Sequence, residues 1–281
     1  MSKTIVFNES RNYKQNLFSV FGFLLQEFPV FTKFLAIIYG PVFIISALLS
    51  YFLLSSGYSG TIYSIIFACF VLLNIFLIIN FVLSYFQLHI RGTEFSITEF
   101  IEEMFETIQK TANLIIISII AVAFEFFIIF IADGTGINVG NSLFFEIVTV
   151  NLFLYLLFNL IIPISVFDNV GSLKMQLSKA LNLINGNFVV SILSFLIFCG
   201  IAEIFVGFNY FLLNSLYSEY WKESFSRALY DEGYYKVIIN IVSLLFYVIV
   251  PIFMTTYSVF TYFGIKSEEG EIEKSRKGFH I

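Results

Sequence analysis

The sequence is poor in the residues that carry most metal and nucleophilic chemistry. Its 281 residues include two His and two Cys, and only 12% are charged. His89 and His280 are too few for a histidine-rich metal centre, and no Ser-His-Asp or Cys-His arrangement can be assembled from them. Cys69 and Cys199 both fall inside apolar runs, so we interpret them as buried apolar residues. We therefore expect no catalytic residue, no cofactor and no metal, and a protein that is not an enzyme.

The scarcity of charge also indicates whether the chain folds in water or in a lipid bilayer. Soluble domains carry about a quarter charged residues, whereas 58% of this chain is hydrophobic and its mean hydropathy is +0.89. Several runs of about 20 apolar residues are long enough to cross a bilayer as helices. Basic patches typical of nucleic-acid binding are absent, so no nucleic-acid partner is expected. The composition predicts an all-α, polytopic membrane helix bundle.

Six apolar runs are the expected membrane spans. We place them at about 34–54, 61–88, 112–132, 143–167, 188–213 and 236–263. Short turns join the spans in pairs, as at 55–60 and 133–136, where Gly, Ser and Asp are frequent. An amphipathic segment precedes each pair. The order of amphipathic helix, span, turn and span therefore occurs three times.

The three amphipathic segments show apolar residues at helical spacing opposite a polar face. The first begins at Leu17 and is interrupted by Pro29, and the second opens with Ser96 and Glu99, a capping-box pattern. The three apolar stripes are Leu17, Val20, Phe21, Leu24, Leu25 and Phe28; Ile97, Phe100, Ile101, Met104, Phe105 and Ile108; and Leu173, Leu177, Ala180, Leu181 and Ile184. The polar faces include Glu99, Glu102, Glu103 and Glu106 in the second segment, and Lys174, Gln176, Ser178, Lys179 and Asn182 in the third. We expect each helix to lie in the membrane interface, with its apolar face in the acyl boundary.

The three units resemble one another weakly. Offsets of 83 and 76 residues place 23–31, 106–114 and 182–190 at the same position. A helix-weakening residue occurs at similar depth in the second span of each unit, and this suggests a shared kink: Asn80, Pro163 and Pro251. We therefore predict one six-span membrane domain at 1–265, with units of about 14–88, 96–167 and 172–263, and a charged cytoplasmic tail at 266–281.

Lys and Arg gather on one side of the expected bundle. Twelve of the fifteen lie on the side that holds both termini and the three amphipathic helices. The positive-inside rule therefore predicts that both termini and these helices are cytoplasmic.

Two stretches resemble known membrane proteins. The run RNYKQNLFSVFGFLLQEF, with the following FLAIIYGPVFIISALL, looks like the start of a group of uncharacterised bacterial six-helix membrane proteins. The stretch FDNVGSLKMQLSKALNLINGNFVVSIL resembles a superfamily that includes the membrane domain fused to some glycerophosphodiester phosphodiesterases. The resemblance implies a multi-pass protein of the bacterial cytoplasmic (inner) membrane and implies no activity. Some members of the group carry a carotenoid-oxygenase label, but that chemistry needs several His ligands to iron.

Two carboxylates inside expected spans are the sharpest candidate site. Glu125 and Glu203 lie at nearly the same depth in the first spans of the second and third units. A carboxylate within the bilayer is costly and indicates function by default. With Asn151 and Asn159 as uncharged ligands, the pair could bind a proton or a cation. Alternatively, each carboxyl is neutral and hydrogen-bonds a neighbouring helix as part of the packing, or both lie nearer the outer interface.

Two functions follow from these features. The leading hypothesis is a non-enzymatic membrane protein, structural or lipid-interacting, that acts through its cytoplasmic interfacial helices. Lys174 and Lys179 would contact anionic headgroups. The expected partners are membrane lipids, and a protein partner or a second copy in a homo-oligomer. The alternative is a small transporter or channel that uses Glu125 and Glu203 near the midplane.

Overall fold

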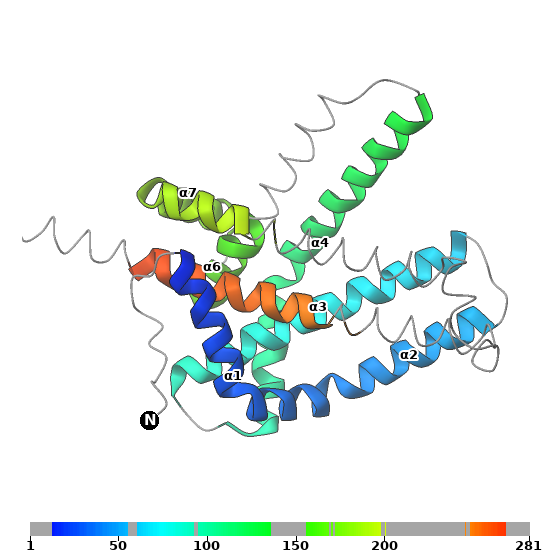
Figure 1. The fold of residues 1–281 in the computed structure, drawn as a ribbon, viewed down its shortest axis with the longest axis horizontal. Coiled ribbons are helices and arrows are strands. Elements are labelled where there is room, and N and C mark those ends of the chain that lie inside the picture. Colours follow the sequence, from blue (N-terminus) through cyan, green and yellow to red (C-terminus); the bar gives the residue numbers. More distant parts are fainter. Residues whose placement is uncertain are drawn as a thin grey trace, which may run out of the picture. The chain divides into compact units, whose positions relative to one another are not determined.

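The computed structural model describes residues 13–55, 61–92, 95–135, 156–168, 170, 172–197, 200, 245 and 248–267. The labelled elements are α1 (Tyr13–Ile38), α2 (Gly40–Ser55), α3 (Thr61–Arg91), α4 (Ile97–Thr135), the π-helix η1 (Leu157–Ile161), α6 (Ile162–Phe167) and α7 (Leu173–Gly186), drawn in Figure 1. Two further helices are Phe188–Ile197 and Val248–Ser267. Within these ranges there is no strand, so the all-α prediction is confirmed for this part of the chain.

Three described helices are long and apolar enough to cross a membrane. They are Lys14–Ile38, Leu73–Arg91 and Val248–Ser267. The first of these is the segment predicted to be interfacial, whereas the expected first span at 34–54 is broken at Tyr39 and contains the shorter apolar helix Gly40–Leu49. A fourth span is formed if Leu173–Asn185 and Phe188–Ile197, which are bent by 104° to each other, cross together. These helices are compatible with a membrane protein. Large parts of the fourth, fifth and sixth expected spans lie outside the described residues, so the six-span count and the threefold repeat stay predictions.

The first helix, α1, does not end at its proline, Pro29. The sequence predicts an interruption at Pro29, but α1 continues through this residue, and the break lies at Tyr39, directly before Gly40 and Pro41. A proline inside a helix removes one backbone hydrogen bond. The carbonyl that loses its donor is the one four residues earlier, that of Leu25. The helix nevertheless continues through Pro29 to Ile38.

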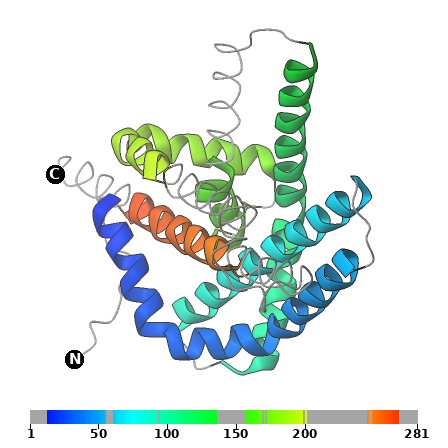
Figure 2. The ribbon, with the colours of Figure 1, turned by 45° about the vertical axis from the view of Figure 1, so that its right-hand side comes forward.

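The capping box at the start of α4 is confirmed. The backbone N–H of Ser96 donates to Glu99 Oε2 at 2.7 Å, and the N–H of Glu99 donates to Ser96 Oγ at 3.3 Å. The bonds from the backbone and hydroxyl of Ser96 lower the pKa of the Glu99 carboxyl. From this cap α4 runs without interruption to Thr135, as Figures 1 and 2 show. The second expected interfacial helix and the third expected span are therefore one helix.

Helix irregularity is found at one of the three positions predicted to share a kink. Pro163 lies at the start of α6, directly after the π-helix η1. Asn80 instead lies within the uninterrupted α3, where its amide donates to the carbonyl of Phe76 at 2.8 Å. An Asn keeps its backbone N–H, whereas a proline removes one helical hydrogen bond. Pro251 lies near the start of Val248–Ser267.

The chain divides into two compact units, and α1 and α3 contribute to both. The first unit comprises Met1–Glu27, Val82–Cys199 and Met254–Ile281. Its core contains Phe23, whose ring stacks on Phe86 with 4.5 Å between centroids and meets Phe260 edge-on at 5.9 Å. These three side chains come from α1, α3 and the helix Val248–Ser267, so aromatic packing joins the three helices.

The second unit comprises Phe28–Phe81 and Gly200–Phe253. Within it, Phe31 of α1 meets Phe81 of α3 edge-on, with 5.2 Å between ring centroids. A buried polar cluster surrounds Asn74, whose amide donates to Ser46 Oγ at 3.1 Å and whose oxygen accepts from the Tyr39 hydroxyl. The break between α1 and α2 is thereby joined to α3 by hydrogen bonds.

Candidate functional site

The expected carboxylate site falls mostly outside the described residues. Glu125 lies in α4, but its side chain is not among those described, and Glu203 and Asn151 lie outside the described residues altogether. Asn159 is described and is fully buried in η1. The proton or cation site, with its packing alternative, therefore stays a prediction.

The two lysines predicted to meet headgroups have different surroundings in α7. Ser172 caps this helix, because its hydroxyl accepts from the N–H of Met175 at 3.3 Å. Lys174, in the first turn, is exposed. Lys179 lies one turn further along, and its Nζ is 2.6 Å from Asp168 Oδ2. Lys174 is thus accessible to an anionic group, while Lys179 is already paired within the protein.

The packed face of α7 is not the apolar stripe that its sequence predicts. The buried residues of this segment are Gln176, Ala180, Leu183 and Asn187. The prediction that Gln176 faces outward is wrong: it is 5% exposed, and its amide donates to the carbonyl of Val170 at 2.5 Å. Leu173 and Leu181, both in the predicted stripe, are 42% and 48% exposed. Around the helix axis, at about 100° per residue, the mean direction of the buried residues lies about 70° from the centre of the predicted apolar stripe.

The first four turns of α4 show the same displacement. The buried residues here are Phe100, Glu103, Thr107, Thr111 and Leu114. Ile97, Ile101 and Phe105 of the predicted stripe remain exposed, Phe105 by 64%. The packed face lies about 90° from the centre of the stripe, in the same direction as in α7. Glu103 was expected on a solvated face and is instead buried.

The N-terminal part of α1 makes a third example. Asn16, Val20 and Phe23 are fully buried, whereas Phe21 and Leu25 of the predicted stripe are exposed by 49% and 77%. The displacement is about 100°, again in the same direction. Each of the three helices therefore packs one edge of its apolar stripe on the protein and leaves the other edge uncovered.

An ion pair or hydrogen bond of a carboxylate also joins each of these helices to another helix. In α1, Glu27 Oε2 accepts from the hydroxyl of Tyr85 at 2.9 Å and lies 3.8 Å from His89 Nδ1. In α4, Glu103 accepts two bonds from the guanidinium of Arg91, at 2.5 and 3.1 Å. Such a two-bond pair fixes both position and orientation. The side chain of Glu103 is only 5% exposed, while that of Arg91 is half-exposed.

In the ion pair of α7 the charges are reversed relative to α4, because the helix contributes a lysine and its partner is a carboxylate. Asp168 follows α6, and its side chain is 6% exposed. Lys266 donates a hydrogen bond to Oδ1 at 2.5 Å, and Lys179 pairs with Oδ2 by charge and proximity. Burial acts to raise the pKa of the Asp168 carboxyl, but the bonds with Lys179 and Lys266 outweigh it, so the pKa lies below its ordinary value. Asp168 therefore joins α7 to the helix Val248–Ser267.

A buried amide joins three further elements of the first unit. Gln87 of α3 accepts from the Thr107 hydroxyl at 2.8 Å and donates to the carbonyl of Val166 at 3.2 Å. Gln87 is 7% exposed and Thr107 is fully buried. These bonds connect α3, α4 and α6. Because Gln87 and Thr107 are both buried, losing either bond would leave a buried polar group without a partner, which lowers the stability of the fold.

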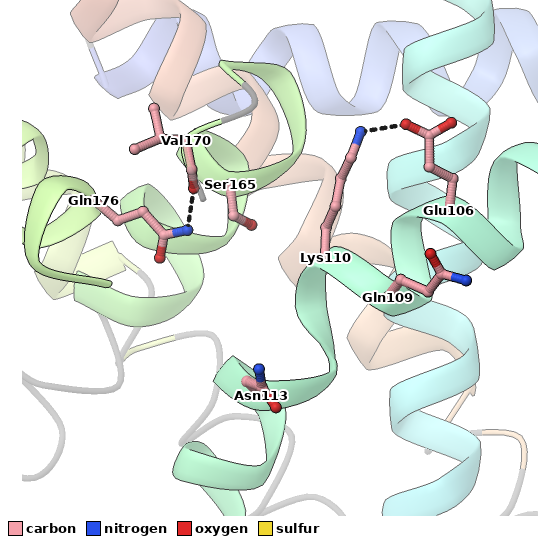
Figure 3. A pocket seen from close by; sticks show the side chains of 7 residues that line it. All are labelled: Glu106, Gln109, Lys110, Asn113, Ser165, Val170 and Gln176. Atoms are coloured by element: carbon pink, nitrogen blue, oxygen red, sulfur yellow. Dashed lines mark hydrogen bonds and ion pairs between the residues drawn. The ribbon is translucent and has the colours of Figure 1, made fainter. Parts of the chain in front are cut away.

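A polar cavity of about 290 Å³ lies between α4 and the α6–α7 segment (Figure 3). It is lined by Glu106, Gln109, Lys110, Asn113, Ser165, Val170 and Gln176. Lys110 Nζ is 2.7 Å from Glu106 Oε1, and this hydrogen bond, with the lysine's charge, lowers the pKa of the Glu106 carboxyl. The sequence does not predict the cavity, because its two walls are about 60 residues apart in the chain. The polar faces of the amphipathic segments are the one signal for it.

Comparisons of the chain with protein-family models, curated proteins and solved structures find no match. The resemblance to six-helix bacterial membrane proteins therefore stays a prediction.

Proposed function

We propose that the protein is a non-enzymatic integral membrane protein whose interfacial helices rest on membrane lipid. The observation that carries this proposal is the displacement between apolar stripe and packed face in α1, α4 and α7. Exposing apolar surface to water costs about 25 cal/mol for each Å². An amphipathic helix in the interface avoids this cost, because its apolar side enters the acyl boundary.

Charge supports the same placement. Lys174 is exposed at the start of α7, close to the uncovered Leu173, so an ammonium group and an apolar group would reach the headgroup and the acyl region together. An anionic membrane surface attracts a nearby lysine by about 1 kcal/mol. The excess of Lys and Arg on one side supports a cytoplasmic position for these helices and both termini, and the proposed location is the bacterial inner membrane.

In this proposal the protein is a structural or assembly component. The ion pairs of Glu103 and Asp168 fix the interfacial helices to the ends of the membrane helices, so the lipid-facing edges are held in a defined position. Such a rigid surface suits binding of lipid, of a protein partner or of a second copy. No described residue is assigned a catalytic role.

Membrane depth tests the proposal directly. Spin labels would be placed at Phe105→Cys and Leu181→Cys on the uncovered edges. Matched labels at Glu102→Cys and Ser178→Cys would lie on the exposed polar faces of the same helices. All would be introduced after Cys69 and Cys199 are replaced by Ala. In bilayers, we expect the first two labels to collide more with oxygen and the second two with a polar nickel complex. Equal accessibility of all four labels to the nickel complex would overturn the proposal.

A further inference from the structure

The cavity beside α4 lies on a different side of that helix from the uncovered apolar edge. Phe105 belongs to the apolar edge, while Glu106, Gln109 and Lys110 line the cavity (Figure 3). At about 100° per residue, Gln109, Glu106 and Lys110 lie about 40°, 100° and 140° beyond Phe105 around the helix. If the apolar edge is in the acyl boundary, as the proposed function requires, these side chains point away from the acyl chains and toward the headgroups.

The charges of the cavity favour a ligand that carries both signs. Lys110 and Glu106 form a pair 2.7 Å apart, and the side chain of Glu106 is about half-exposed. An anion that approaches Lys110 is repelled by Glu106, and a cation that approaches Glu106 is repelled by Lys110. A zwitterion can place its anion on Lys110 and its cation on Glu106, so that every charge keeps a partner. Arrangements that penalise the wrong charge are a general source of specificity.

The chemistry of the lining distinguishes between kinds of ammonium. A quaternary ammonium is typically bound over aromatic rings, and none of the described residues that line the cavity is aromatic. A primary ammonium needs hydrogen-bond acceptors. Glu106, Gln109 and Asn113 provide carboxylate and amide oxygens.

We infer that this cavity binds a phosphoethanolamine group, with the phosphate on Lys110 and the primary ammonium on Glu106. The volume of about 290 Å³ is at the lower end for ligand sites and suits a headgroup rather than a whole lipid. The inference rests on the proposed function for its depth in the membrane, and it adds a ligand class to it. The shared chemistry is that of phosphatidylethanolamine and of free phosphoethanolamine.

The test uses the full chain, purified in detergent and offered equal amounts of phosphatidylethanolamine, phosphatidylcholine and phosphatidylglycerol. Native mass spectrometry then counts the lipids retained. We expect phosphatidylethanolamine to be retained in preference to the other two. Glu106→Lys or Lys110→Glu should each lower this retention roughly tenfold, which corresponds to about 1.4 kcal/mol.

Two further variants control the experiment. The exchange of Glu106→Lys with Lys110→Glu in one chain restores one charge of each sign and should restore the preference. Glu102→Gln removes a charge at an exposed position of the same helix outside the cavity, without placing a lysine four residues before Glu106, and it should leave retention unchanged. Thermal unfolding in detergent shows whether each variant is folded. If the single variants unfold, the exchange variant carries the test, because it must keep the preference.

Equal retention of the three lipids, or unchanged retention in Glu106→Lys and Lys110→Glu, would overturn the inference. Displacement of the lipid by free phosphoethanolamine would assign the site to the free compound as well as to the lipid. Retention that free phosphoethanolamine does not reduce would assign it to the lipid alone. The depth measurement on Phe105 and Leu181 does not depend on these variants, so failure of this inference and failure of the proposed function can be told apart.

Discussion

The starts of α4 and α7 share a serine cap and an ion pair at the same spacing, but the charges of the two ion pairs are exchanged. Each helix follows a serine cap, at Ser96 and Ser172, and these residues are separated by the 76 residues of the predicted repeat. In each, the hydroxyl accepts from the N–H three residues later at 3.3 Å. Seven residues after each cap, the helix contributes one residue of an ion pair: Glu103 in α4 and Lys179 in α7.

The partners of these two residues also correspond. Arg91 ends α3, and α4 is the next helix in the chain. Asp168 directly follows α6, and α7 is the next helix. The same 76-residue offset relates further pairs of buried residues: Phe100 and Gln176, Thr107 and Leu183, and Thr111 and Asn187. Position and burial therefore agree at these three pairs. At the ion pairs it is the carboxylate that is buried in both cases: Glu103 and Asp168 are 5% and 6% exposed, whereas Arg91 and Lys179 are 53% and 41% exposed. The two places thus use ion pairs of opposite polarity, and the threefold repeat stays a prediction.

The largest expected effect comes from breaking the ion pair of α4. Arg91→Ala would leave Glu103, with 5% of its side chain exposed, without its two bonds. Removing one partner of a buried pair costs about 3 kcal/mol or more, and because Arg91 is half-exposed we expect a loss near that lower figure. The measurement is denaturant unfolding of the purified protein in detergent.

The exchange of both charges sharpens the comparison. Arg91→Asp combined with Glu103→Lys would give α4 the polarity that α7 has. We expect the double variant to recover most of the stability that Arg91→Ala loses. A double variant no more stable than the single one would show that polarity at this position is not exchangeable.

The next largest effect is expected at Asp168, and it depends on pH. Its pKa lies below the ordinary 3.8, so the carboxylate stabilises the folded state fully above that value and loses this contribution as the pH falls through the lower, folded pKa. Asp168→Asn should cost about 1.5 kcal/mol at neutral pH, because the bonds to two half-exposed lysines are lost. Below about pH 4 the free energy of unfolding of the wild type should fall as Asp168 is protonated, and the variant should not show this fall.

Unfolding in detergent between pH 7 and pH 3 measures both effects. Glu102→Gln, at an exposed position of α4, serves as the control and should follow the wild-type curve. Parallel curves for the wild type and Asp168→Asn would contradict the role of the α7 ion pair.

The smallest expected effects are at the two caps. Ser172→Ala removes the acceptor of the Met175 N–H and should cost about 1 kcal/mol. Ser96→Ala should cost less, because Glu99 still accepts from the backbone N–H of residue 96. Hydrogen exchange of the first turns of α4 and α7 would measure the difference. Faster exchange in the Ser96 variant than in the Ser172 variant would show that the capping box adds nothing.

Local sequence signals predicted the parts of this structure that depend on neighbours in the chain. The capping box at Ser96, the irregular helix at Pro163 and the helical class of the described segments all follow from residues within one or two turns. Pro29 was predicted to interrupt α1 because its local effect is unfavourable, but the surrounding helix outweighs the one hydrogen bond it removes. The burial of Glu103 was missed because Arg91, which makes it possible, lies in another helix.

Residues close together in the chain therefore predicted the helical segments, the Ser96 cap of α4 and the positions of the apolar stripes. The tertiary structure alone decided which edge of each stripe packs on protein, which charges pair and where a polar cavity forms. The physical reason is that an apolar stripe records only the avoidance of water and does not distinguish a protein neighbour from lipid. That distinction needs the positions of the other helices, which leave residues such as Leu25, Phe105 and Leu181 exposed. In the proposed function these are the residues that lipid covers.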